Sequence, residues 1–238
     1  MLNPDLYPHI FKRKSIRKYS DTPMLAEEIN TVQGAIYSLT PLFPKEKYTL
    51  EFNPDKQRVY AYCENTITGN ANVGFLLQQL DLALFSASLG RLWFGMGREP
   101  KDLKTMPTLS YAICLKIGVA TEPIARQSTN EFDRKPINEV IDNIDLQPAF
   151  EAVRLAPSAR NSQPWRFIRE GDAIHAFRKR PGFIAAALLG RMNQCDMGIA
   201  LCHAILALEH DGHTIKEISS GTPISVPDGY EYTATIQI

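Results

Sequence analysis

Two stretches of the chain are apolar on nearly every side of a helix, and they organise the rest of the pattern. Residues 72–89 carry one apolar stripe at helical spacing, which Phe75, Leu82 and Phe85 extend almost all round. Residues 196–210 repeat this character. A helix that is apolar on all sides is buried, so both are predicted to lie at the centre of the fold. Polar residues such as Gln78 interrupt the first stretch, which argues against a membrane span.

These two predicted helices also resemble each other. Each opens on a residue of the capping type, Asn72 or Asp196, carries a glycine two positions later, and ends at a glycine. Outside them, helical patterns at residues 27–38 and 147–155 each lead into a turn that contains proline. Strand-like patterns close each half at residues 109–117 and 231–238. The chain is therefore interpreted as an internal duplication.

The repeat suggests where the chain divides. We expect one half over residues 1–125 and a second over residues 126–238, intertwined as one structural unit. The least structured segment, residues 119–133, is rich in turn-forming and polar residues and is interpreted as the connection.

Bulk composition narrows the possible partners. The chain has 26 basic and 26 acidic side chains, so no global field favours nucleic acid or an anionic membrane, and neither is expected as a partner. No apolar signal segment is visible near the N-terminus. The four cysteines form no C-x-x-C pair, and Cys114 and Cys202 lie in apolar segments, which is typical of reduced thiols in a cytoplasmic protein.

Residues 156–167 form the most unusual local sequence, which reads APSARNSQPWRF. Proline, serine and asparagine favour a turn with outward backbone N–H groups, and Asn161 and Gln163 offer donors and acceptors to a flat heterocycle. Pro164 favours an extended exit, and Trp165 is expected to pack beside such a site rather than contact a ligand. A plain polar turn between a helix and a strand is an equally good interpretation of the residue types alone.

A second candidate lies near the N-terminus, where Arg13, Ser15 and Arg17 occupy alternate positions. Alternate side chains of an extended segment share one face, so two guanidinium groups and a hydroxyl would make a phosphate clamp. A solvated basic run is the alternative.

Together the two segments resemble the FMN-dependent nitroreductase family. Its members begin with Arg-x-Ser-x-Arg and carry Ala-Pro-Ser-x-x-Asn-x-Gln-Pro-Trp-x-Phe, and both elements are present here without a mismatch, at residues 13–17 and 156–167. In the usual member the second element follows the first within a few dozen residues, whereas here more than a hundred separate them. Ordinary members are intertwined homodimers in which one subunit clamps the phosphate and its partner's turn covers the flavin.

A fused pair of halves explains the unusual spacing. The resemblance implies an α+β fold with three layers (α/β/α), a mostly antiparallel sheet flanked by helices, and two halves that mimic the homodimer. It also implies one remaining FMN site, with the clamp from the first half and the turn from the second, whereas the second site has degenerated. A monomer is then plausible and a homodimer possible.

The resemblance implies the chemistry as well. A reduced nicotinamide, NADH or NADPH, would pass hydride to flavin N5, and a nitroaromatic, quinone or similar small electron acceptor would then take it. No separate catalytic acid or base is required. The residues expected to bind FMN are Arg13, Lys14, Ser15, Arg17, Gly95, Met96, Gly97, Arg134, Pro157, Ser158, Ala159, Asn161 and Gln163.

Other assignments for these residues stay open. The glycines at 95 and 97 fit a simple tight turn as well as a flavin contact, and Arg134 fits an exposed linker as well as a phosphate contact. The histidines at 203, 210 and 213 do not complete a plausible metal shell. A flavoenzyme with other chemistry, such as dehalogenation or flavin breakdown, and a non-catalytic descendant that binds flavin or another ligand remain rivals.

Overall fold

The computed structural model describes residues 1–95, 108–221 and 225–238. In the first half the elements are a 3₁₀ helix (Pro4–Phe11), α1 (Ala26–Tyr37), β1 (Tyr48–Asn53), β2 (Arg58–Cys63), α2 (Ile67–Ser86), β3 (Gly90–Phe94) and β4 (Ser110–Gly118). Short 3₁₀ helices follow at Thr129–Glu131, Ile137–Glu139 and Ile144–Leu146. The second half contains α3 (Gln147–Arg154), a 3₁₀ turn (Ala159–Asn161), β5 (Trp165–Glu170), β6 (Ala173–Lys179), α4 (Phe183–His210), β7 (Glu217–Ser219) and β8 (Tyr230–Gln237).

The two halves build the same sheet twice. One sheet has the order β1-β2-β4-β3 and the other β5-β6-β8-β7, with antiparallel pairing throughout. The two central strand pairs, β2–β4 and β6–β8, share an irregularity. Their register shifts at Ala61/Tyr62 in β2 and at Ala176/Phe177 in β6. The expected α+β fold with two repeated halves is confirmed.

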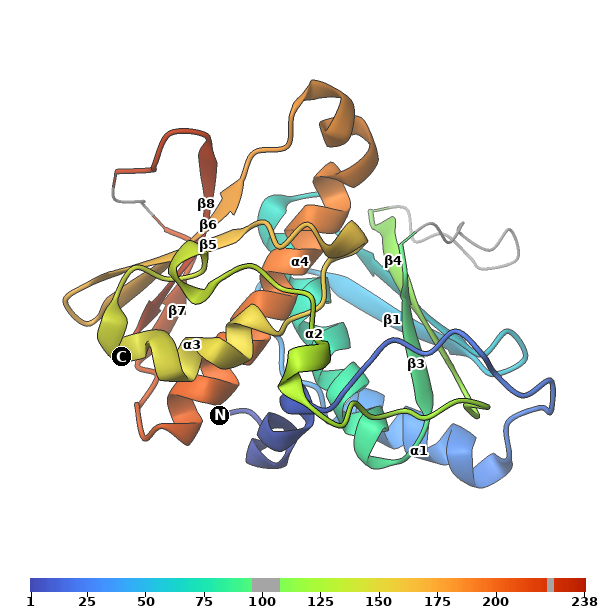
Figure 1. Cartoon of the computed structure of the whole chain (residues 1–238). Coiled ribbons are helices and arrows are strands. Elements are labelled where there is room, and N and C mark those ends of the chain that lie inside the picture. The colour runs from blue at the N-terminus through green and yellow to red at the C-terminus, as the bar shows by residue number, and fades with distance from the viewer. Residues whose placement is uncertain (96–107, 222–224) are drawn as a thin grey trace.

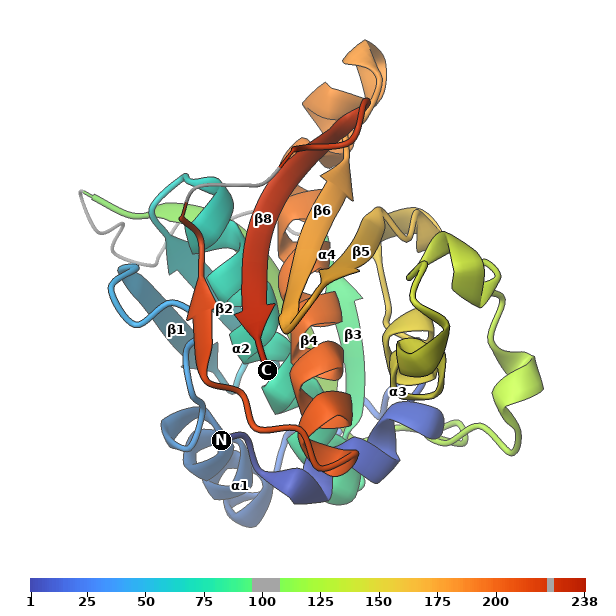
Figure 2. The same cartoon turned by 90° about the vertical axis from the view of Figure 1, so that its left-hand side faces the viewer.

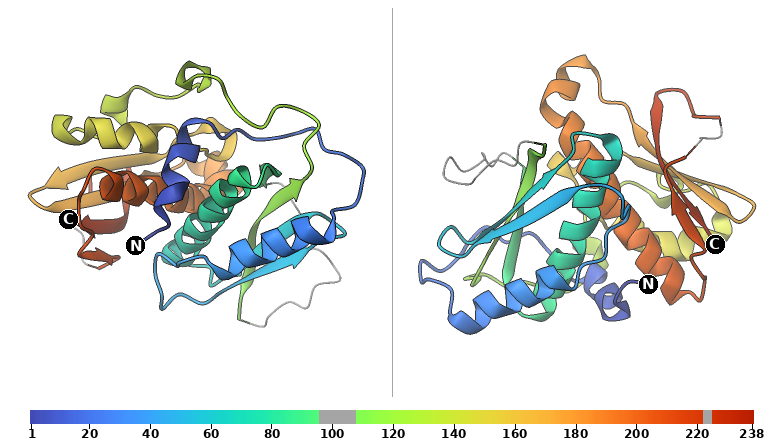
Figure 3. Two further views of the ribbon diagram at one scale, coloured as in Figure 1. Left: turned by 90° about the horizontal axis from the view of Figure 1, so that it is seen from below. Right: turned by 180° about the vertical axis from the view of Figure 1, so that it is seen from behind.

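The paired helices α2 and α4 separate the two sheets. Figure 1 shows α2 and α4 crossing in the middle, with one sheet on each side, and Figure 2 shows β5, β6 and β8 lying over α4. Figure 3 shows α1 beside α2 and the first sheet, and it shows the N-terminal 3₁₀ helix beside α2 and α4. The apolar side chains from Ala71 to Leu82 in α2 and from Cys195 to Leu208 in α4 are buried, as the all-round pattern predicts, and Leu76, Leu77, Ala200 and Leu201 are fully covered.

Two glycines determine how closely α2 and α4 approach. A Cβ atom added to Gly74 would lie 1.9 Å from the carbonyl oxygen of Cys195, and one added to Gly198 would lie 1.8 Å from that of Ala71. The contact is therefore symmetric, because a glycine of each helix lies against the backbone of the other helix. Beside it, Asn70 Nδ2 donates to Gln194 Oε1 over 2.9 Å, and these residues are 124 positions apart, the same shift that relates the two glycines. A pseudo-twofold axis thus passes through the crossing.

Both central helices begin earlier than the sequence suggested. Asn72 and Asp196 were expected as N-caps, and this was wrong, because α2 starts at Ile67 with Thr66 as its cap and α4 starts at Phe183. Both side chains are instead buried within their helices, where each accepts a backbone N–H from the turn of its own half. Asn72 Oδ1 accepts from Phe43 over 3.0 Å, and Asp196 Oδ1 accepts from Ala159 over 3.0 Å.

The connection between the halves is fastened to the N-terminal segment. Isolated bridges join Arg13 to Ala125 and Tyr19 to Ala120, both antiparallel. The backbone N–H groups of Arg17 and Lys18 also donate to the Glu122 carboxylate, over 2.6 and 3.1 Å. The candidate clamp and the connection therefore lie side by side, although the division at residues 125 and 126 stays a prediction.

Replacing Gly198 with alanine should destabilise the protein strongly. The new methyl group would overlap the α2 backbone, which cannot rotate away as a side chain can, so we expect a loss of about 3 kcal/mol or more and a fall in Tm of roughly 10 °C. Thermal unfolding followed by circular dichroism measures this.

Gly34→Ala is the matched control. Gly34 lies inside α1, and an added Cβ would meet nothing within 4 Å. Alanine should therefore raise the Tm or leave it unchanged. Equal Tm values for the two variants would contradict the proposed crossing.

Candidate functional site

The turn at residues 156–163 has a strained backbone. Arg160, Asn161 and Gln163 have positive φ angles of 52°, 57° and 46°. Non-glycine residues seldom adopt this region, and they persist there only where neighbouring contacts hold them. The Ser158 hydroxyl supplies one such contact, because it accepts the backbone N–H of Gln163 over 2.9 Å.

Helix α4 supplies the main support for this turn. Asp196 accepts the Ala159 N–H with both carboxylate oxygens, over 3.0 and 3.2 Å. Asn193, one turn earlier, donates from Nδ2 to Ser162 Oγ and to Asp196 Oδ2, over 2.9 Å in each case. The turn is thus fixed to a helix whose own position is set by the crossing with α2.

Asp196 is an unusual carboxyl group. It is 4% exposed, and burial raises its pKa to about 7, although hydrogen bonds from Asn193 and Ala159 and the charge of Arg178 act against this rise. Asn72 makes the equivalent contact in the first half without a titratable group. Each half therefore holds its turn by the same hydrogen bond, which an amide accepts in the first half and a carboxyl group accepts in the second.

The two amide side chains of the turn bind the connecting segment. Asn161 Oδ1 accepts from Arg134 Nη1 over 2.8 Å, and its Nδ2 donates to the Asp133 carbonyl oxygen over 2.9 Å. Gln163 Oε1 accepts the Lys135 N–H over 2.8 Å. In this structure both amides therefore hold residues 133–135, and a direct contact with a flavin stays a prediction.

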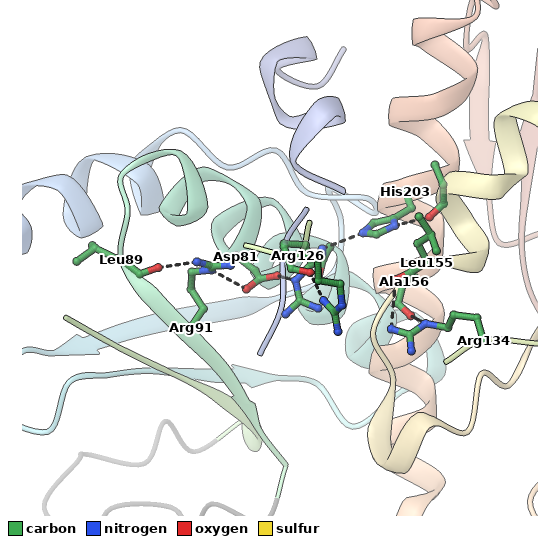
Figure 4. Close-up of polar contacts among 11 residues, drawn as sticks. Asp81, Leu89, Arg91, Arg126, Arg134, Leu155, Ala156 and His203 are labelled. Atoms are coloured by element: carbon green, nitrogen blue, oxygen red, sulfur yellow. Dashed lines mark hydrogen bonds and ion pairs between the residues drawn. The ribbon is translucent and has the colours of Figure 1, made fainter. Parts of the chain in front are cut away.

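Four arginines gather between the N-terminal segment and this turn, and we call Arg13, Arg91, Arg126 and Arg134 the arginine cluster. Figure 4 shows Arg91 and Arg126 on the two sides of Asp81, with Arg134 against Leu155 and Ala156. Arg13 Nε lies 2.8 Å and Arg91 Nε 3.2 Å from the carboxylate oxygens of Asp81, and all three side chains are at most 1% exposed.

The remaining two members join the cluster through backbone and aromatic contacts. The guanidinium of Arg126 donates to the Arg13 carbonyl oxygen, and it lies 4.0 Å from the Phe132 ring centre. Arg134 lies 5.5 Å from the same ring and donates to the carbonyl oxygens of Ala156 and Leu155 over 3.1 and 3.3 Å. Arg134 is therefore no exposed linker charge.

The cluster contains four guanidinium groups and one buried carboxylate, Asp81, whereas the exposed carboxylates Glu131 and Asp133 lie near Arg126 and Arg134. Burial is the largest cause that lowers the pKa of Arg13, of Arg126 and of Arg134, the last to about 10, and the neighbouring guanidinium charges of the cluster lower the pKa of Arg13 and Arg134 further. In addition, the buried Nη2 of Arg13 has no hydrogen-bond partner within the described part of the chain. An unpaired buried donor among like charges favours the binding of an anion.

His203 lies close to the cluster but is itself fully satisfied. Its Nδ1 lies 2.7 Å from the Ala152 carbonyl oxygen and its Nε2 lies 2.9 Å from Gln78 Nε2. The carbonyl requires a proton on Nδ1, so Nε2 accepts from the Gln78 amide. Burial lowers the pKa of His203 to about 4, with Arg13 and Arg134 adding to the effect. We interpret this neutral histidine as a structural link between α2, α3 and α4.

Of the other residues that the sequence predicts to bind FMN, only some lie near the arginine cluster. Lys14 and Ser15 are half-buried and Arg17 is exposed, so the two arginines of the N-terminal motif lie in different environments and a clamp that uses both stays a prediction. Pro157 is buried next to Ala156. A Cβ atom at Gly95 would lie 2.5 Å from Met192 Sδ, which brings the end of β3 against α4. Met96 and Gly97 lie outside the described residues.

Sequence reasoning missed Asp81, Arg91 and Arg126. None lies in a recognisable motif, and Arg126 falls in the connection where no regular pattern exists. One signal was present for Arg134, because residues 132–137 (FDRKPI) match residues 11–16 (FKRKSI) at the phenylalanine, arginine, lysine and isoleucine. The second half therefore does retain a partial counterpart of the N-terminal motif.

These features define a protein of the nitroreductase fold whose single chain contains two pseudo-repeated halves. The chain belongs to the family described as "Putative TM nitroreductase", whose model matches residues 5–208. Family membership supports an oxidoreductase activity. In the described parts, no helix combines the length and apolar character needed to cross a membrane.

A solved structure supports the same fold. A "putative nitroreductase" from Thermotoga maritima is 21% identical, with a TM-score of 0.68 over 98% of this chain and 93% of that one. Weaker likenesses include the hypothetical oxidoreductase YcnD of Bacillus subtilis, 15% identical with a TM-score of 0.46 over 61% and 78% of the two chains. An FMN-dependent nitroreductase of Clostridium difficile is 13% identical, with a TM-score of 0.39 over 51% and 91%. No curated protein matches the chain.

Asp196 should give the stability a distinct pH dependence. Below about pH 4 the group is protonated whether the chain is folded or not, whereas between pH 4 and 7 only the folded protein keeps the proton. The stabilisation is therefore complete at low pH and is lost as the pH rises through about 7. The free energy of unfolding of the wild type minus that of Asp196→Asn should fall by roughly 3–4 kcal/mol between pH 4 and 8.

Urea unfolding of both proteins across this pH range measures the difference. Asparagine keeps an oxygen for the Ala159 N–H, as Asn72 does for Phe43. His203 titrates in the opposite sense, since its pKa is lowered, but it is common to both proteins and cancels in the difference. A difference that does not change with pH would show that folding does not raise the pKa of Asp196.

Proposed function

We propose that the chain is an FMN-dependent oxidoreductase with one flavin site, built across the seam between its two halves. The observation that carries this proposal is the arginine cluster, where Arg13 pairs with the buried Asp81, Arg126 donates to the Arg13 backbone, and Arg134 binds the start of the turn at residues 156–163. An excess of buried guanidinium charge is suited to a phosphate monoester.

The residues present fit the phosphate of FMN. The Nη2 of Arg13 is buried without a partner, so a phosphate oxygen that reached it would satisfy the donor. Arg126 and Arg134 would lower the energy of the same anion, and in turn the anion would offset their mutual repulsion. When bound, FMN would supply hydride-transfer chemistry that no side chain of the chain provides.

The chain's own residues would orient the cofactor and restrict access to it. Asp196 and Asn193 hold the turn through Ala159 and Ser162, so Pro157 and Ser158 are presented from a fixed backbone. A Cβ atom at Gly95 would lie 2.5 Å from Met192 Sδ, so a larger residue there would displace the end of that side chain. Support for a flavin site across the seam comes from contacts between the halves, because Arg126 binds the Arg13 backbone and Gly95 lies against Met192.

The proposed reaction takes reducing equivalents from NADH or NADPH and delivers them to a nitroaromatic, a quinone or a similar conjugated acceptor. The residues at the seam suit this class of reaction, because it demands orientation and charge stabilisation rather than an acid–base pair. Since both parts of the site come from one chain, the proposal does not require a second subunit.

One observation favours a second candidate, a descendant of the fold that binds flavin or another ligand without turnover. Arg13 is 1% exposed and pairs with the fully buried Asp81, a contact that also holds the N-terminal segment to α2. An arginine that is held in this way serves the fold whether or not a phosphate is bound.

FMN affinity tests the proposed site. Arg126→Gln removes one cluster charge but leaves the buried pair of Arg13 and Asp81 intact. A hydrogen bond to a charged group contributes about 1.5–3 kcal/mol, so the variant should bind FMN about ten to a hundred times more weakly. Quenching of flavin fluorescence during titration measures the change.

Arg180→Gln is the matched control, because Arg180 is exposed, pairs only loosely with Glu231 and belongs to no part of the arginine cluster. Its FMN affinity should equal that of the wild type. Protein that cannot be reconstituted with FMN would contradict the proposal. Bound FMN whose absorbance neither NADH nor NADPH bleaches would favour the non-catalytic candidate.

A further inference from the structure

Phe132, in the connecting segment, has two guanidinium groups over its ring. The guanidinium carbon of Arg126 lies 4.0 Å from the ring centre, and that of Arg134 lies 5.5 Å from it. The Phe132 side chain is buried and belongs to the larger hydrophobic core. A cation over an aromatic face is attracted by the ring, most strongly where water is excluded. The ring therefore stabilises two arginines whose charges repel each other.

The two arginines differ in the donors that they have left. The Nε, Nη1 and Nη2 atoms of Arg134 each donate to a backbone carbonyl oxygen. The half-buried side chain of Arg126 donates from Nη1 to the Arg13 carbonyl oxygen, and it binds no other acceptor within the described part of the chain. A guanidinium group has five N–H donors. Of the two arginines, Arg126 is therefore the one that keeps donors for an anion.

No carboxylate of the described residues forms an ion pair with Arg126. The charge of Glu131 acts on Arg126, but Glu131 Oε1 accepts the backbone N–H groups of Gln127 and Ser128, over 2.7 and 3.0 Å. These two bonds hold the carboxylate against its own backbone. The guanidinium of Arg126 is thus positioned by an aromatic ring and a carbonyl oxygen rather than by a carboxylate, which would compete with an anion.

The repeat supplies an internal comparison. Phe11 is the counterpart of Phe132 in the matching motif of the first half. The Phe11 ring meets Tyr7 edge to face, with ring centres 5.2 Å apart, and no guanidinium of the described residues lies over it. The equivalent ring serves packing in the first half and also contacts arginine in the second. The arginine contact is therefore a property of one half and not of the repeated motif.

We propose that Phe132 is a positioning residue for phosphate recognition and that it acts through Arg126. This inference rests on the proposed function, because the anion is taken to be the phosphate of FMN. An arginine side chain loses rotamer freedom when it binds an anion, and a ring that already fixes the guanidinium removes part of this cost. Phe132 therefore contributes to the preference for FMN over riboflavin, which lacks the phosphate.

Titrations of FMN and of riboflavin test this role, with quenching of flavin fluorescence as the readout. Phe132→Leu keeps an apolar side chain but removes the ring, so FMN should bind about tenfold more weakly, whereas riboflavin affinity should change less than about twofold. Phe132→Tyr keeps the ring and should retain the affinity for FMN. Phe11→Leu is the matched control, because it removes the equivalent ring without removing an arginine contact; the preference for FMN over riboflavin should not change.

A double-mutant cycle shows whether Phe132 acts through Arg126. In the Arg126→Gln background, Phe132→Leu should have little further effect on FMN affinity, because the group that the ring positions is already absent. A purely structural role of the ring would instead weaken FMN binding equally in both backgrounds. The cycle uses FMN alone, so it decides the question even where riboflavin binds too weakly to measure.

The outcomes separate this role from the proposed function. Equal losses of FMN and riboflavin affinity in Phe132→Leu, or an unchanged FMN affinity, would overturn the role of Phe132 and leave the flavin site intact. A wild-type protein that binds neither flavin would overturn the proposed function and the positioning role together. If Phe132→Leu does not fold, Phe132→Met is held to the same criteria, because the flexible methionine fills an irregular space more readily.

Discussion

The close contact of α2 and α4 at Gly74 and Gly198 is the constraint on which the rest of the structure depends. At each glycine, backbone atoms of the other helix occupy the space that a side chain would need. The crossing therefore tolerates no larger residue at Gly74 or at Gly198. Each helix carries its own half's sheet on its outer face. The relative position of the two sheets, and of every loop attached to them, therefore follows from one contact.

This constraint explains how residues far apart in the sequence can form one site. Arg13 reaches Asp81 on α2, whereas Ala159 and Ser162 are held by Asp196 and Asn193 on α4. The N-terminal segment and the turn are thus positioned by different helices, and the crossing converts this into a fixed geometry. The duplication also permitted the halves to diverge, since Asn72 and Asp196 hold equivalent turns although only one of them can titrate.

Much of the fold could be predicted from the sequence, because burial and turn chemistry leave local signals. The apolar character of residues 72–89 and 196–210 indicated central helices, and the repeated glycines indicated two related halves. The helix starts were wrong, because Asn72 and Asp196 have the residue types of caps, and nothing local shows that a turn from elsewhere donates to them. In the helical residues that the sequence missed, Asn70, Gln194 and Cys195 contact the other half, and no local pattern records such contacts.

The site was harder to predict for the same reason. The motifs identified Arg13 and Arg134, but Asp81, Arg91 and Arg126 join them only through long-range contacts. Asn161 and Gln163 were expected to face a ligand, whereas their amides bind the connecting segment, a partner that the sequence places well before the turn. The residue types indicated that Asn161 and Gln163 form specific hydrogen bonds. Only the tertiary fold showed which groups they contact.

The stoichiometry of FMN binding tests the central claim most directly. Flavin titrated into protein of known concentration, with the mass of the complex measured by light scattering, gives the number of FMN molecules per chain. A single site across the seam predicts one FMN per chain at saturation, whatever the oligomeric state. Two FMN molecules per chain would show that both halves of the duplication still bind, and one FMN per two chains would show that the site lies between chains; either result would contradict the account.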